Sequence, residues 1–167
     1  MDKDLNSEEN YNRVKKMLKG EKTIMLSTVD GEYKQGRLVY YVFYKNSVYF
    51  ITKITSNKYK QIKINPIVTF SIIDDSETAL DLNDSFESPD TNIVDDNYIS
   101  TEMEGIAIIK GHTQSEENKK LFEYCSKKCQ EMDDLGKHKN SVLIEIKIKK
   151  IEMWKGQCKV FEKLNKV

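Results

Sequence analysis

Strand-like segments in the first third of this sequence follow one another through turn signals rather than through helices. The segment "KTIMLSTV" (22–29) leads to Asp30-Gly31, a strong hairpin signal, and then to "EYKQGRLVYYVFY" (32–44), which is rich in aromatic and β-branched residues. Lys45-Asn46 separates that segment from "SVYFIT" (47–52). Two adjacent hairpins predict an antiparallel meander. They argue against a doubly wound parallel sheet, in which strands alternate with helices.

Three later segments extend the same pattern. They are "IVTFSII" (67–73), "MEGIAIIKGHT" (103–113) and "SVLIEIKIKKIEMW" (141–154). In the last of them, apolar residues alternate from Val142 to Ile148 and then return at Ile151 and Met153 with the opposite parity, which predicts a β-bulge near Lys149-Lys150. About six strands joined mostly by turns predict a mainly β fold with short helices, built as a small antiparallel barrel.

Three short helices are expected beside these strands. Ser7 can cap "SEENYNRVKKMLKG" (7–20), Pro66 can stop "SNKYKQIKIN" (56–65), and Ser115 can cap "SEENKKLFEYCSKKCQEM" (115–132). In the third helix we expect Leu121, Phe122 and Cys125 to face the core.

The charges of the chain are unevenly distributed. Its 167 residues, 43 of them Leu, Ile, Val or Phe, suit one domain over 1–167 with its own core. The 27 basic and 27 acidic residues cancel, but an acidic insert at 74–104 holds 11 of the acidic residues and no Lys or Arg. We predict that the insert leaves the barrel as a surface loop or a lid, and that the basic remainder suits an anionic ligand. No nucleic-acid-binding motif is present, so no nucleic-acid partner is expected.

Hydropathy and cysteine content predict a soluble, cytoplasmic protein. No apolar run approaches the ~20 residues of a membrane helix, and the start "MDKDLNSEEN" is too polar for a secretory signal. An odd count of three cysteines argues against a disulfide framework. Cys125 and Cys129 would need His112 or His138 to bind a metal, and these residues do not form a metal-binding motif, so no metal site is expected.

The segment "FITKITSNKYKQIKINP" (50–66) gathers hydroxyls, an amide and a lysine where a strand passes into a helix. A helix N-terminus offers unpaired N–H groups and a favourable dipole to an anion, and Thr52, Ser56 and Lys58 add directed donors and charge. Arg37, one of two arginines in the chain, could bind the same anion from the neighbouring strand. The simpler interpretation is that Ser56 caps the helix and the charged side chains are solvated. Local chemistry leaves both interpretations open.

The order of these elements resembles the pyridoxamine 5'-phosphate oxidase-like family, the FMN-binding split β-barrels. The likeness covers nearly all of the chain outside the acidic insert and is carried by "MLSTVDGEYKQGRLVYYVFYKNSVYFIT", "TSNKYKQIKINPIVTFSI", "EGIAIIKGHT" and "VLIEIKIKKIEMWKG". The Ser-x-Lys and Asn-Pro block, together with the closing Trp, is its most specific part. The resemblance implies a Greek-key split barrel that forms a homodimer with FMN at the subunit interface.

The resemblance also implies a set of cofactor-binding residues. By position, Arg37, Ser56 and Lys58 are similar to residues that contact the FMN phosphate region. Asn57 stands where the oxidase often has a further arginine, and Trp154 is either the tryptophan that reaches the flavin from the partner subunit or an ordinary strand-end core residue. The full set is Arg37, Leu38, Val39, Thr52, Ser56, Asn57, Lys58 and Trp154.

Departures from the family pattern narrow the expected activity. The oxidase itself has an arginine–histidine element after the tryptophan, whereas the tail "WKGQCKVFEKLNKV" has neither residue, and Val42 stands where a basic residue is expected. We therefore expect an FMN-dependent oxidoreductase of unknown substrate, with a nicotinamide nucleotide or another small molecule as partner, and not a true pyridoxamine phosphate oxidase. No catalytic residue is assigned. Two alternatives stay open: a non-catalytic flavin or haem carrier, with His112 as the haem-ligand candidate, and a cofactor-free interaction module.

Overall fold

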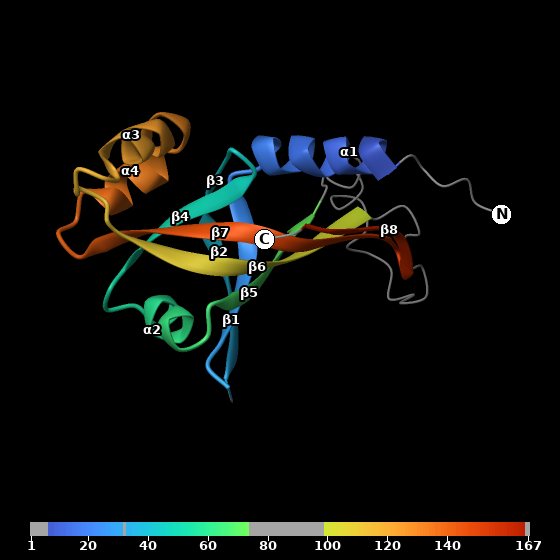
Figure 1. The fold of residues 1–167 in the computed structure, drawn as a ribbon, viewed down its shortest axis with the longest axis horizontal. Coiled ribbons are helices and arrows are strands. Elements are labelled where there is room, and N and C mark those ends of the chain that lie inside the picture. The colour runs from blue at the N-terminus through green and yellow to red at the C-terminus, as the bar shows by residue number, and fades with distance from the viewer. Residues whose placement is uncertain (1–6, 32, 74–98, 166–167) are drawn as a thin grey trace, which may run out of the picture.

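The computed structural model of the chain describes residues 7–31, 33–73 and 99–165. In chain order its elements are α1 (Ser7–Gly20), β1 (Thr23–Val29), β2 (Lys34–Tyr40), β3 (Val42–Tyr44), β4 (Ser47–Lys53), α2 (Asn57–Ile64), β5 (Ile67–Ile73), β6 (Ile99–His112), α3 (Lys119–Lys128), α4 (Gln130–Gly136), β7 (Ser141–Lys155) and β8 (Cys158–Leu164). Figure 1 shows the strands crossing the middle of the molecule, with α1 on one side, α2 on the opposite side, and α3 and α4 together at one end.

The strands form one antiparallel sheet with the order β2-β1-β5-β6-β7-β4-β3, and β8 pairs with β7 outside this path. The two ends of the order, β2 and β3, are separated in sequence only by Tyr41. The chain must therefore bend at Tyr41, and this bend brings the two ends of the sheet together into a split barrel. The predicted antiparallel split barrel is confirmed, with eight strands in the described residues instead of about six.

Two features account for the additional strands. The predicted strand 32–44 is interrupted at Tyr41, because this side chain turns inward, is only 2% exposed, and donates a hydrogen bond from its hydroxyl to the carbonyl oxygen of Leu18 over 2.6 Å. The C-terminal tail, which has no clear strand pattern, forms β8 against the second half of β7 and buries Phe161.

The β-bulge predicted near Lys149-Lys150 is confirmed. Glu104 of β6 pairs with Lys150 and the next residue, Gly105, pairs with Ile148, so Lys149 has no partner in β6. At this bulge the two strands approach so closely that a Cβ on Gly105 would lie 2.5 Å from Cγ2 of Ile146. β6 begins at Ile99, so residues 99–104, which the sequence predicts as part of the acidic insert, belong to the sheet. Residues 74–98, with the expected surface loop or lid, lie outside the described residues.

The helices agree with the sequence except at the third. α1 spans the predicted residues and buries Val14 and Leu18. The predicted cap at Ser115 is wrong: α3 begins after Asn118, whose side-chain amide donates to the carbonyl oxygens of Lys110 and His112 over 3.1 and 2.9 Å. Asn118 thereby ties the end of β6 to the helix start. The extended backbone of Cys129 then divides the expected single helix into α3 and α4.

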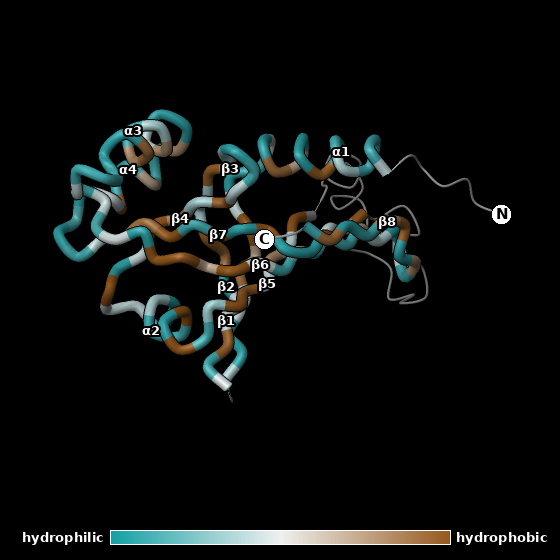
Figure 2. The backbone as a smooth tube through the Cα atoms, in the orientation of Figure 1, coloured by the Kyte–Doolittle hydropathy of each residue, from teal (hydrophilic) through white to brown (hydrophobic). Residues whose placement is uncertain are grey.

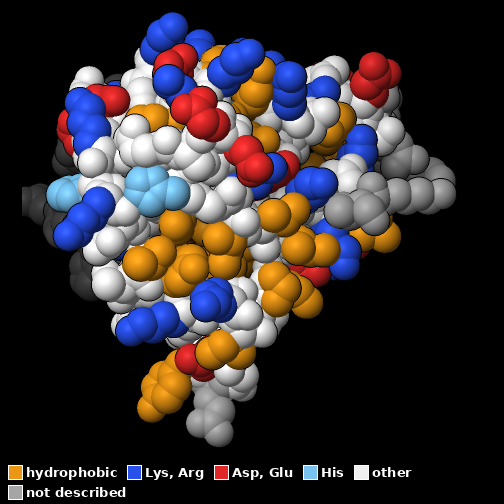
Figure 3. Space-filling view, turned by 60° about the vertical axis from the view of Figure 1, so that its left-hand side comes forward, with side chains coloured by type: hydrophobic (Ala, Val, Ile, Leu, Met, Phe, Trp, Pro, Cys, Tyr) orange, Lys and Arg blue, Asp and Glu red, His pale blue; other side chains and the backbone are white. Residues whose placement is uncertain are grey.

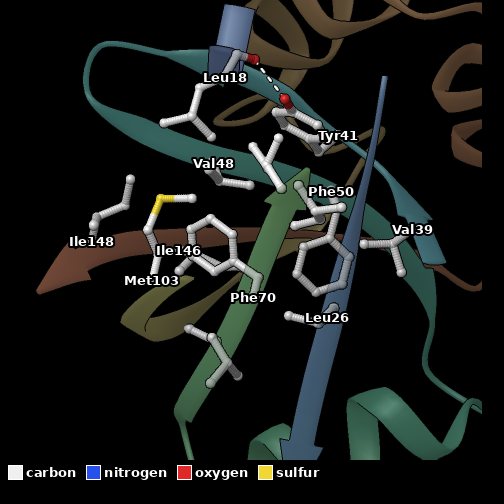
Figure 4. Packing of buried hydrophobic residues seen from close by; sticks show 14 of the residues in the cluster. Leu18, Leu26, Val39, Tyr41, Val48, Phe50, Phe70, Met103, Ile146 and Ile148 are labelled. Carbon is white, nitrogen blue, oxygen red and sulfur yellow. Dashed lines mark hydrogen bonds between the residues drawn. The ribbon is translucent and has the colours of Figure 1, made fainter. Parts of the chain in front are cut away.

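The main core lies inside the barrel. Leu26, Phe50, Ile144 and Ile146 are fully buried there, and Figure 4 shows Phe50, Phe70 and Met103 converging from different strands. The hydropathy colouring of Figure 2 shows that apolar residues lie along the central strands and on the side of α1 that faces the sheet. A second buried cluster joins α3 and α4 to β3, β4 and β7, and consists of Val42, Tyr49, Ile51, Cys125, Cys129, Met132 and Leu143.

Candidate functional site

The junction of β4 and α2 gathers two hydroxyl groups at a helix start. Ser56 is the N-cap of α2, and its Oγ accepts a hydrogen bond from the backbone N–H of Tyr59 over 3.2 Å. Thr52, at the end of β4, lies 2.7 Å from the same Oγ through its own hydroxyl. The capping role expected of Ser56 is therefore confirmed.

Arg37 reaches this junction from β2. Its Nη2 donates to the side-chain oxygen of Gln35 over 2.5 Å and to that of Gln61 over 3.3 Å. Its Nε is buried and has no hydrogen-bond partner among the described residues. Burial lowers the pKa of the guanidinium, and the oxygens that hold it belong to neutral amides, which do not cancel its charge.

Lys58 brings a second positive charge to the same place. Its side chain is half-buried in the first turn of α2. Its pKa is lowered first by desolvation and then by repulsion from Arg37, so the two cations lie close enough to interact. Within the described part of the chain, neither of them forms an ion pair with a carboxylate. Two partly desolvated cations without a counter-charge form a site that an anion would stabilise.

A cavity of about 280 Å³ opens beside this junction. We call it the helix-start cavity, and its lining consists of Leu38, Val39, Tyr40, Ile51, Thr52, Lys53, Thr55, Ser56, Lys58 and Leu135. Five predicted site residues meet there: Leu38, Val39, Thr52, Ser56 and Lys58. Leu135 comes from α4, and sequence reasoning missed it because only the packing of α4 against β4 brings it near the junction.

A second cavity, of about 630 Å³, lies between α2 and the β1–β2 hairpin. We call it the hairpin cavity, and it is lined by Asp30, Tyr33, Lys34, Gln35, Asn57, Lys60, Gln61 and Ile64. The predicted site residue Asn57 lines this cavity and does not line the helix-start cavity. Arg37 lines neither cavity, although its hydrogen bonds to Gln35 and Gln61 join it to the wall of the hairpin cavity.

Trp154 lies far from the junction within one chain. Thr52 pairs with Val142 in β7, and Trp154 is twelve residues further along the same strand. At ~3.3 Å per residue this is roughly 40 Å of strand. A single chain therefore does not bring Trp154 to the other candidate residues, and its contribution from a partner subunit stays a prediction.

The two histidines lie near each other on the surface, as Figure 3 shows. The Nδ1 of His112 accepts from the backbone N–H of Gln114 over 3.0 Å, and its Nε2 contacts the carbonyl oxygen of Lys139. A neutral ring with its proton on Nε2 satisfies both contacts, so neither nitrogen is free to bind iron in this conformation. Among residues 7–31, 33–73 and 99–165, no group of three or more His, Cys, Asp or Glu residues is arranged to hold a metal.

The closed antiparallel sheet and the cavity at its strand-to-helix junction define a split-barrel protein. The family model described as pyridoxamine 5'-phosphate oxidase matches residues 12–155, and the chain belongs to that family. None of the curated proteins matches this sequence. Of the helices in the described residues, none combines the length and hydropathy needed to span a lipid bilayer.

Several solved structures share the fold. General Stress Protein 26 from Bacillus anthracis is 18% identical with a TM-score of 0.63, and the match covers 92% of this chain and 97% of that one. HutZ, the haem storage protein from Vibrio cholerae, is 14% identical with a TM-score of 0.61 and coverages of 83% and 89%. A FAD-binding protein from Mesorhizobium loti is 12% identical with a TM-score of 0.64 and coverages of 85% and 91%. At these identities the likeness shows the fold alone.

Proposed function

We propose that this chain is an FMN-binding flavoprotein, an oxidoreductase of unknown substrate related to the pyridoxamine 5'-phosphate oxidases. The observation that carries the proposal is the pairing of Arg37 and Lys58, two partly desolvated cations with no described carboxylate partner, beside the hydroxyls of Thr52 and Ser56. A phosphate group matches this set of donors because it carries about two negative charges and three acceptor oxygens.

The residues of the helix-start cavity, together with Arg37, which interacts with Lys58, divide between the two ends of the cofactor. Ser56, Lys58 and Arg37 would hold the phosphate, and the apolar wall of Leu38 and Val39 would lie against the ring system. A bound flavin would supply hydride transfer, and the protein would bind, orient and shield the ring. No side chain is assigned as a catalytic acid or base. A nicotinamide nucleotide is a candidate electron donor, and the missing arginine–histidine element in the tail argues against pyridoxamine phosphate as substrate.

We propose further that the working unit is a homodimer with the cofactor at the subunit interface. Apolar side chains stand exposed on the outer surface of β1 and β2, where Met25 and Leu38 face each other across the two strands and are 42% and 66% exposed. Exposed apolar patches of this kind mark interaction surfaces. A partner chain that covered this surface would close the helix-start cavity and could supply Trp154, which a single chain does not bring there.

The haem-carrier alternative receives less support from this site. Similar structures include haem proteins, HutZ among them, but both ring nitrogens of His112 are engaged with the chain's own backbone. The cofactor-free alternative rests on Asn57 in place of an arginine. It is weakened because Arg37 and Lys58 already place two cations at the junction.

Titration of the purified protein with FMN, followed by flavin fluorescence or calorimetry, tests the proposal. We expect Arg37→Ala and Lys58→Ala each to weaken binding at least about tenfold, since each removes a charge-assisted hydrogen bond of roughly 1.5–3 kcal/mol. Lys63→Ala is the matched control, because Lys63 is exposed on the same helix and lines neither cavity. No FMN binding by the parent protein, or equal losses in all three variants, would contradict the proposal.

A further inference from the structure

Gln61 is a buried polar residue that connects Arg37 to the core of the fold. It lies on α2, is only 6% exposed, and accepts hydrogen bonds at its side-chain oxygen from two different strands. The hydroxyl of Thr28, which is 1% exposed in β1, donates to this oxygen, and Nη2 of Arg37 donates to it over 3.3 Å. The proposed function assigns Arg37 to the phosphate and leaves Gln61 without a role.

The orientation of the Gln61 carboxamide follows from the chemistry of its neighbours. A guanidinium has donors only, so Arg37 can bond to the oxygen of the amide and not to its NH₂ group. Thr28 donates to the same oxygen from a fixed place in the sheet, directly opposite Gln35 of β2. The amide therefore joins α2 to both strands of the β1–β2 hairpin and has little freedom to turn.

The contacts that hold Arg37 in place do not cancel its charge. Gln35 and Gln61 both accept from Nη2, over 2.5 and 3.3 Å, and both are neutral. In the part of the chain that the structure describes, no carboxylate forms an ion pair with Arg37. Its charge lowers the pKa of Lys58, so the guanidinium is held near a second cation. A neutral acceptor at position 61 therefore preserves two positive charges at the start of α2.

We propose that Gln61 is a positioning residue of the anion site: its buried amide fixes the guanidinium of Arg37 near Lys58 and, being neutral, leaves both positive charges available to a doubly charged phosphate. A glutamate at this position could accept from the same two donors, but it would neutralise Arg37. The amide thus sets the charge of the site as well as its geometry. This inference rests on the proposed function and deepens it, because it names the residue that makes the site selective for a phosphate of two negative charges.

Titration of Gln61→Glu with FMN and, separately, with riboflavin tests this role. The two ligands share the ring system and differ by the phosphate, so the ratio of their affinities measures the phosphate contacts alone. We expect the variant to bind FMN at least about tenfold more weakly, because one charge-assisted contact is lost, and to bind riboflavin as the parent does. Urea denaturation should show a folded protein, since the carboxylate still accepts from Thr28 and Arg37.

Gln35→Glu is the matched control for this change. Gln35 accepts from the same Nη2 of Arg37, but its side chain is exposed, so solvent screens a charge placed there. We expect Gln35→Glu to weaken FMN binding by less than about threefold. An equal loss in the two variants would show that the buried position of Gln61 has no special role.

A double-mutant cycle tests whether Gln61 acts through Arg37. Gln61→Met removes the acceptor and keeps a side chain of similar length. We expect it to weaken FMN binding in the parent and to have little further effect in the Arg37→Ala background. Losses that simply add in the double variant would mean that Gln61 acts independently of Arg37. If Gln61→Glu does not fold, or if riboflavin binds too weakly to measure, this cycle decides alone.

The outcomes separate this inference from the proposed function. Unchanged FMN affinity in Gln61→Glu would overturn the role of Gln61 and leave the phosphate site at Arg37 and Lys58 intact. An equal loss of FMN and riboflavin affinity would also overturn it, because Gln61 would then only support the fold around the ring. Failure of the parent to bind FMN would remove the proposed function itself, and the role of Gln61 with it.

Discussion

At the scale of single residues, the candidate site depends on two cations that the fold holds near each other. Lys58 would be disfavoured in the first turn of α2 by the helix dipole even if it were solvated, and here it is also partly desolvated and close to Arg37. Its lowered pKa means that the folded protein binds a proton at Lys58 less readily than the unfolded chain does. The unliganded fold should therefore gain stability as pH rises through this lowered pKa towards the usual 10.5.

A bound phosphate should reverse this preference, because it favours charged Lys58. We expect the affinity for FMN to fall as pH rises through the lowered pKa of Lys58 towards the 10.5 of an ordinary lysine. Titrations across that range in the parent and in Lys58→Met measure the effect. The variant should bind more weakly at neutral pH and should show a flatter pH dependence. The same slope in both proteins would assign the titration to another group.

At the scale of elements, the bulge between β6 and β7 shows how one small residue permits a strand irregularity. Gly105 lies where β7 carries its extra residue, and a Cβ there would lie 2.7 Å from the carbonyl oxygen of Lys147 as well as against Ile146. That oxygen belongs to the backbone, so it cannot move aside as a flexible side chain could. The local sequence of β7 predicted the bulge because the alternation of apolar and polar residues indicates which face of the strand each residue occupies, and this alternation changes parity at the bulge.

We expect Gly105→Ala to lower the free energy of unfolding by roughly 1–3 kcal/mol, the usual cost of overpacking. Urea denaturation measures the change. Gly36→Ala, in β2, is the matched control, since its Cβ would meet only Oγ of Ser27 at 3.6 Å and Sδ of Met25 at 3.7 Å, which are ordinary contacts. Equal stability of the two variants would show that the strands at the bulge can separate without cost.

At the scale of the whole molecule, the bend at Tyr41 closes the antiparallel sheet into a barrel, because it brings the end strands β2 and β3 together. The hydroxyl of Tyr41 fixes this bend to the end of α1 through Leu18, as Figure 4 shows, so the helix covers the place where the two ends of the sheet come together. The exposed apolar side chains of β1 and β2 remain outside this closure, and they carry the proposal of a homodimer.

Light scattering on the purified protein should give a mass near twice the 19.5 kDa of the chain. Met25→Asp should shift the protein towards the monomer and weaken FMN binding at the same time, because a charge facing Leu38 would oppose burial of this surface. Leu164→Asp is the control, since Leu164 is an exposed apolar residue of β8. A monomeric parent, or a dimer that only Leu164→Asp disrupts, would contradict this interface.

The sequence by itself determined the features that depend on neighbouring residues. Turn dipeptides and period-two alternation predicted the antiparallel strands and the bulge, and cap and stop residues predicted α1 and α2, because these signals act over a few residues. The Ser-x-Lys block likewise indicated where hydroxyls and charge would gather. The Ser115 prediction failed because the side chain of Asn118 bonds to the end of β6, a contact made only in the folded chain.

Only the tertiary structure decided which distant residues meet. β8 forms a strand because it pairs with the free edge of the second half of β7. The sequence of β8 has no alternation of apolar and polar residues that would predict this strand. The barrel closes because Tyr41 turns into the core, and the candidate site exists because closure brings Arg37 of β2 beside Lys58 of α2 and Leu135 of α4 beside Thr52. Such contacts join residues that are distant in the sequence and depend on the packing of the whole core. Local sequence patterns therefore do not predict them.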